Sequence, residues 1–137
     1  MLKNGTQPDG SGGHPTVNCD ITSWHWYSNE SDMTNACGGT GCHDALGILK
    51  NWGKPIWINE FGVRPDLGST NQIAAYITSS KMMAQYYSVA SKYNIQSIQQ
   101  FELYDDSEGE YGLMQADGKS LKAAFYAMKA FIKNNPK

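Results

Sequence analysis

The alternation of hydrophobic and polar positions divides the chain into three strand-like runs, each followed by a helix-like segment. β-Branched and aromatic side chains fill the predicted strands, which are residues 17–27, 54–61 and 95–104. Apolar residues recur at helical spacing in the predicted helices, which are residues 43–52, 69–93 and 120–133. Because strands separated by helices form βαβ units, this order predicts an α/β fold with a parallel sheet and right-handed crossovers.

Polar residues at the ends of these segments support the helix assignments. Ser69 and Gln72 have the spacing of a capping box, which predicts the start of the second helix, and Asn94 is placed to end it. The third helix is expected to turn six side chains toward the core: Leu121, Ala124, Phe125, Met128, Phe131 and Ile132.

The chain is predicted to be one partial domain, residues 1–137. Residues 1–15 are expected to be loop, and the three βα units are 16–53, 54–94 and 95–133. The last unit carries an acidic loop and a small hairpin with an Asp117–Gly118 turn. Three parallel strands make a poor free-standing sheet, because parallel sheets have both faces and preferably both edges covered. The pattern therefore favours part of a larger barrel.

One carboxylate, Glu60, lies at a position where α/β folds commonly carry catalytic residues. Pro55 opens an apolar run and Gly62 closes it, so Glu60 falls at the carboxyl end of the second strand. Such a group is either catalytic or a structural carboxylate that caps the sheet. The acidic residues after the third strand are expected to be solvated or to cap turns: Asp105, Asp106, Glu108 and Glu110.

Alternation along the first strand places His25 and Tyr27 on one face, available to Glu60. From the residues alone, His25 is better explained as a buried, hydrogen-bonded histidine. The strand tryptophans are expected on the opposite face, packed against helices: Trp24, Trp26 and Trp57.

Charge and composition exclude several classes of function. The formal net charge of −2 argues against a nucleic-acid partner, which needs a basic patch. No apolar run approaches the about 20 residues that span a membrane, and residues 1–13 lack the features of a signal peptide. No glycine-rich phosphate loop follows a strand, which disfavours a flavodoxin-like or dinucleotide-binding fold.

The cysteines suggest a disulfide. Cys37 and Cys42 flank a glycine-rich segment flexible enough to close a small loop, which implies an oxidising compartment. Cys19 is expected to be a small buried apolar group. The alternative, a metal site of Cys37, Cys42 and His43, lacks a clear fourth ligand, so no metal or organic cofactor is expected.

Three motifs, in order, resemble clan A glycoside hydrolases, which are retaining enzymes built on a (β/α)8 TIM barrel. His25-Trp26-Tyr27 resembles the H-x-Y near the end of their sixth strand. Residues 55–62 resemble the seventh, P-x-W-x-x-E-F-G. Residues 101–105, followed by Tyr111-Gly112-Leu113 and an Ala-Phe-Tyr-Ala helix, resemble the eighth strand, its loop and the closing helix.

The resemblance implies a partial TIM barrel holding the last three of eight units, since a whole barrel needs about 250 residues. It implies that Glu60 is the nucleophile, supported by His25 and Tyr27. Phe101 or Tyr104 would take the place of a tryptophan that floors the sugar subsite, and Glu102 would line the cleft.

The resemblance also implies a secreted parent acting on a polysaccharide or oligosaccharide. The family's acid/base follows the fourth strand, which this chain lacks, so weak or no activity is expected from the monomer. Its partners would be a carbohydrate substrate and either the missing N-terminal units or a second copy. The alternative is a non-catalytic half-barrel that binds carbohydrate or pairs with another chain.

Overall fold

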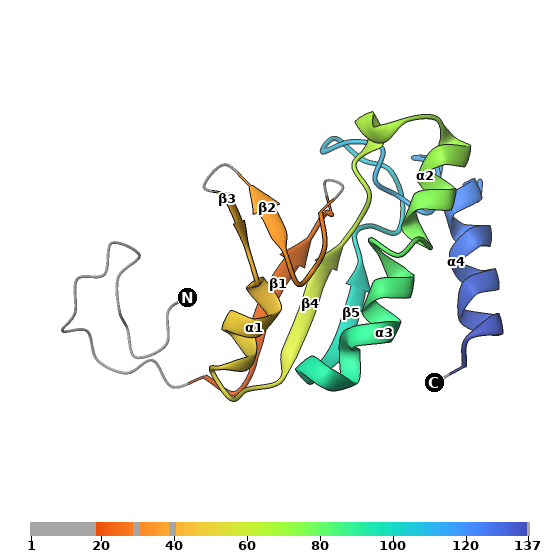
Figure 1. The fold of residues 1–137 in the computed structure, drawn as a ribbon. Coiled ribbons are helices and arrows are strands. Elements are labelled where there is room, and N and C mark those ends of the chain that lie inside the picture. Colours follow the sequence, from red (N-terminus) through yellow and green to blue (C-terminus); the bar gives the residue numbers. More distant parts are fainter. Residues whose placement is uncertain (1–18, 29–30, 39–40, 137) are drawn as a thin grey trace.

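The computed structural model describes residues 19–28, 31–38 and 41–136. The strands are β1 (Thr22–Trp26), β2 (Ala36–Gly38), β3 (Gly41–His43), β4 (Ile56–Phe61) and β5 (Ile95–Gln100). The helices are α1 (Ala45–Lys50), α2 (Thr70–Ile77), α3 (Met83–Tyr93) and α4 (Ala123–Asn134), with a 3₁₀ turn, η2, at Pro65–Leu67. Figure 1 shows this mixed α/β arrangement.

The predicted parallel sheet is confirmed. Strands β1, β4 and β5 correspond to the three predicted strands and pair in that order, with both pairs parallel. β4 is therefore the central strand, and its carboxyl end carries Glu60 between the ends of its two neighbours. The predicted strand 95–104 stops at Gln100, and a cis peptide joins Phe101 to Glu102 just beyond it.

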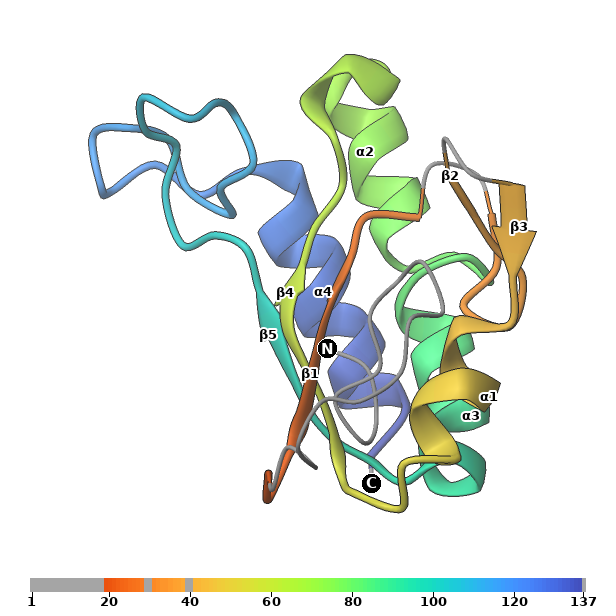
Figure 2. The ribbon, with the colours of Figure 1, turned by 90° about the vertical axis from the view of Figure 1, so that its left-hand side faces the viewer.

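The hydrophobic core lies between the sheet and the helices. Figure 2 shows the sheet nearly edge-on, with α1, α2 and α3 on one side of it. Strand residues buried against this layer include Trp26, Ile56, Ile58 and Phe61, and they meet Leu46, Ile77, Met83 and Tyr86 from the helices. The other face is open: Ser23 and Trp57, which pair across β1 and β4, are exposed there.

The capping predictions are confirmed, whereas the long second helix is not. Ser69 and Gln72 form the reciprocal capping box of α2, and Asn94, in the left-handed conformation, ends α3. Between α2 and α3 the helix breaks, because hydroxyl side chains bind nearby backbone: Thr78 donates to the Ala75 carbonyl and Ser79 accepts from the Lys81 amide. The break frees the Lys81 carbonyl, which accepts a 3.1 Å hydrogen bond from the Trp26 indole.

The segment between β1 and α1 contains a short hairpin. β2 and β3 pair antiparallel, and the predicted disulfide joins Cys37 to Cys42 across them. Both sulfurs of the alternative metal site are therefore bonded to each other. Within the described residues, no group of three or more His, Cys, Asp or Glu side chains is placed to share a metal ion. Cys19 is a free thiol and is partly exposed rather than buried.

The last helix has a narrower buried face than predicted. Ala124 is buried, and Met128 and Phe131 pack against the core. Leu121 and Ile132, both expected to face inward, are 38% and 48% exposed. The reason is that α4 packs chiefly against α2, with a ring contact between Phe131 and Tyr87 of α3.

Candidate active site

A β-bulge decides which way Glu60 points. Trp24 pairs with Ile58, but the next residue, His25, pairs with Glu60, so Asn59 is an extra residue in β4. A bulge reverses the side-chain alternation beyond it. Glu60 therefore lies on the same face as Trp57, and the prediction that Trp57 packs against the helices is wrong.

The three predicted catalytic side chains meet at one oxygen atom. The Tyr27 hydroxyl donates a 3.1 Å hydrogen bond to Oε2 of Glu60, and Nδ1 of His25 lies 3.1 Å from the same oxygen. The side chains of His25 and Glu60 are 53% and 33% exposed, so His25 is not the buried histidine that the residues alone favoured. Both neighbours therefore contact the same carboxylate oxygen, Oε2.

The electrostatics of Tyr27 favour its role as a donor. Burial of the phenol, followed by its hydrogen bond to Glu60, raises the pKa of Tyr27 well above its ordinary value. The hydroxyl therefore keeps its proton at every pH at which the site would work. Its hydrogen bond holds the carboxylate in one orientation.

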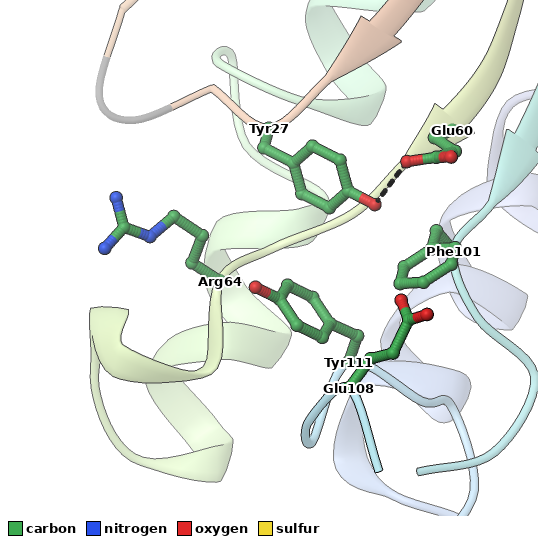
Figure 3. A pocket seen from close by; sticks show the side chains of 6 residues that line it. All are labelled: Tyr27, Glu60, Arg64, Phe101, Glu108 and Tyr111. Carbon is green, nitrogen blue, oxygen red and sulfur yellow. Dashed lines mark hydrogen bonds between the residues drawn. The ribbon is translucent and has the colours of Figure 1, made fainter. Parts of the chain in front are cut away.

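Glu60 lines a pocket of about 400 Å³. Six residues line this pocket, as Figure 3 shows: Tyr27, Glu60, Arg64, Phe101, Glu108 and Tyr111. The three aromatic rings contact one another edge to face, with centroids 5.7–6.2 Å apart. They form an aromatic wall beside the carboxylate of Glu60.

Gly62 explains why glycine follows the strand. A Cβ at this position would lie 2.6 Å from the Tyr27 ring and 2.8 Å from the Phe101 carbonyl oxygen. Only a residue without a side chain lets the chain pass so close to both. The glycine is therefore required for the packing of Tyr27 beside Glu60.

Of the three predicted substrate-binding residues, the structure brings only Phe101 into the pocket. Tyr104 is 51% exposed and does not line it. Glu102 does not line the pocket either, and its Oε1 is buried without a hydrogen-bond partner among the described residues. Desolvation, and then the nearby Asp106, raise the pKa of Glu102.

Three lining residues were not predicted as site residues: Arg64, Glu108 and Tyr111. They come from the segments that follow β4 and β5, where no periodicity indicates which side chains turn inward. Two signals were present in the sequence: Arg64 lies four residues after Glu60, and Tyr111 begins the Tyr-Gly-Leu motif.

A buried ion pair holds the loop after β5. Lys122 Nζ lies 2.8 and 3.0 Å from the two oxygens of Asp105 and donates to the Glu110 carbonyl at 2.9 Å. Asp105 also accepts from the Gly112 amide at 2.8 Å. Asp105 is only 7% exposed, so the prediction of a solvated or turn-capping residue is wrong. The pair fixes both ends of the segment that carries Glu108 and Tyr111.

Comparisons with known proteins found no relative of this chain. No protein-family model, curated protein or solved structure matches the chain. None of the helices in the described part of the chain is long and apolar enough to cross a membrane.

Proposed function

We propose that this chain is the C-terminal part of a retaining glycoside hydrolase that cleaves O-glycosidic bonds, with Glu60 as its nucleophile. One observation carries the proposal. Glu60 stands at the carboxyl end of the central parallel strand, and His25 and Tyr27 both contact its Oε2 at the mouth of an aromatic-walled pocket. Retaining enzymes need an oriented, ionised carboxylate beside the anomeric carbon.

In the proposed reaction, an oxygen of Glu60 attacks the anomeric carbon as the bond from that carbon to the leaving oxygen breaks. Tyr27 and His25 hold the carboxylate through Oε2, and both can also reach sugar hydroxyls. The aromatic wall of Tyr27, Phe101 and Tyr111 packs against the ring. Water then displaces Glu60 and restores the original anomeric configuration.

The arrangement of the sheet supports assignment to a partial TIM barrel. β1 and β5 each pair with β4 on one side only, so both outer edges of the described sheet have no partner strand. In a closed barrel the open face with Ser23 and Trp57 would point inward, and the helical layer outward. The Cys37–Cys42 disulfide fits a secreted parent.

A second candidate is a non-catalytic half-barrel that binds carbohydrate or pairs with another chain. Two exposed apolar features favour it. Trp57 is 36% exposed on the open face, and an apolar groove of about 290 Å³ on α4 is lined by Leu113, Phe125, Met128 and Ile132, with Lys129 at its side.

A trapping experiment tests the primary proposal. The chain is incubated with 2-deoxy-2-fluoro glycosides of glucose, mannose and xylose that carry a good leaving group, and its intact mass is measured. We expect one glycosyl adduct, mapped by peptide sequencing to Glu60. A folded chain that forms no adduct, or forms one elsewhere, would contradict the nucleophile assignment and favour the half-barrel.

Tyr27→Phe tests the hydrogen bond to Glu60 while keeping the aromatic ring. A hydrogen bond to a charged group contributes about 1.5–3 kcal/mol, so the rate of adduct formation should fall by roughly 10- to 100-fold. Tyr104→Phe is the matched control, because Tyr104 is exposed and lies outside the pocket. Equal labelling rates for the two variants would show that the Tyr27 hydroxyl does not assist Glu60.

A further inference from the structure

We propose that the apolar groove on α4 is a docking surface for an amphipathic helix that lies outside this chain and carries carboxylates along its flanks. The groove receives the apolar side chains of that helix, and lysines of α4 pair with its carboxylates. The groove shares no residue with the pocket at Glu60. The inference therefore holds whether or not Glu60 is a nucleophile.

The floor of the groove is an apolar stripe on one face of α4. Phe125, Met128 and Ile132 follow one another at intervals of three and four residues, which places them on the same helix face. Leu113 completes the floor from the loop after β5. Helices that bind in grooves insert apolar side chains with this same spacing, so the stripe matches a helical partner.

The shape of this surface favours a protein partner over a membrane. Ile132 is 48% exposed, and the neighbouring Tyr126, which contacts the Phe125 ring edge to face, is 58% exposed. Single exposed apolar residues are ordinary, whereas a continuous apolar hollow marks an interaction site. A hollow accepts side chains that protrude from a partner, whereas a protein that lies on a membrane inserts protruding side chains of its own.

The charges of the outer helices are positive. Residues 69–101 and 118–136, which include α2, α3 and α4, contain no Asp or Glu, although the whole chain has a formal net charge of −2. Lys129 lies at the groove, with its ammonium group 5.9 Å from the centre of the Phe125 ring. Lys133 follows one turn later on α4. Carboxylates on the flank of a docked helix therefore complement this surface.

The same charges argue against a second copy of the chain as the occupant. Two copies that met through α4 would bring Lys129 and Lys133 of each copy together, and such like charges repel. The acidic loop of another copy, residues 105–110, offers carboxylates but none of the apolar side chains that the groove requires. The occupant is therefore a helix of a different sequence.

The position of the groove indicates what else the partner contributes. Figure 1 shows β1, β4, β5 and α4 in that order across the molecule, so α4 lies on the side where β5 ends the described sheet. β5 pairs with β4, and its other edge has no partner strand among the described residues. Because parallel strands need helices to cover their faces, a strand added at that edge brings a helix of its own. We expect the docked helix to belong to such a βα unit.

The test uses two fluorescent 18-residue helical peptides that share one leucine stripe and differ only in their flanks, which carry glutamates in one peptide and lysines in the other. Binding to the chain is measured by fluorescence anisotropy at low ionic strength. The wild type should bind the glutamate peptide at least about fivefold more tightly. Changing both Lys129→Glu and Lys133→Glu should reverse this preference. Lys92→Glu, the same change of charge on α3 outside the groove, should preserve it.

Ile132→Ser tests the apolar floor. Ile132 is half exposed, so the fold should survive, as circular dichroism can verify. Both peptides should bind roughly fivefold more weakly, because part of the buried apolar area is lost, and the preference for glutamate should remain.

Four results would overturn the inference. They are no peptide binding by a folded wild type, equal affinity for both peptides, a preference that Lys129→Glu with Lys133→Glu does not change, and binding to phosphatidylserine vesicles that Ile132→Ser abolishes. The last result would assign the groove to a membrane surface. Labelling of Glu60 by the fluoro glycosides is measured separately and should be the same in all these variants.

Discussion

Glu60→Gln is expected to abolish both adduct formation and glycoside turnover. The amide cannot attack the anomeric carbon, so no covalent intermediate forms and the loss should be roughly 10⁴-fold or more, the scale seen when an enzyme loses its nucleophile. The measurement is steady-state release of 2,4-dinitrophenol from its glycoside, because this leaving group needs no general acid, with circular dichroism to confirm the fold. Folding should survive, since Glu60 is 33% exposed and a glutamine still accepts from Tyr27.

The control for this substitution is Glu110→Gln, which removes the same charge outside the pocket. It should leave turnover unchanged. If the wild type cleaves aryl glycosides and Glu60→Gln retains that rate, then the nucleophile is another group and the site has been assigned wrongly.

Lys122→Met should destabilise the chain by about 3–5 kcal/mol, because it leaves a buried carboxylate without its partner. The side chains of Lys122 and Asp105 are only 10% and 8% exposed, so water cannot replace the lost ammonium group. Urea unfolding followed by tryptophan fluorescence measures the change. Since the pair anchors the loop with Glu108 and Tyr111, adduct formation on Glu60 should also slow.

Two further variants test whether the loss of stability in Lys122→Met comes from the unpaired buried carboxylate. Asp66→Asn breaks an exposed ion pair with Arg64 and should barely move the unfolding midpoint. Adding Asp105→Leu to Lys122→Met removes the unpaired charge and should restore part of the stability. Recovery stays incomplete because the Gly112 amide loses its acceptor. A Lys122→Met chain as stable as Asp66→Asn would show that the pair is not a structural anchor.

The sequence by itself determined the order of the elements and the position of the central carboxylate. Apolar strands separated by helical periods imply parallel pairing, because a strand that returns after a helix runs in the same direction as the one before it. That reasoning located Glu60 at a strand end and found the Ser69–Gln72 capping box, because both depend on residues close together in the chain. The Cys37–Cys42 pair was found for the same reason.

Only the tertiary structure decided how the pocket is made. The bulge at Asn59 arises from the register between β1 and β4. It places Glu60 on the same face as Trp57, whereas strict alternation puts the two residues on opposite faces. Arg64, Glu108 and Tyr111 enter the pocket from irregular segments, whose side chains follow no period. In the sequence, Asp105 resembles the solvated acidic residues beside it. In the folded chain it pairs with Lys122, which is 17 residues away. Local patterns determine elements, whereas side-chain direction at bulges and in loops depends on contacts between residues distant in sequence.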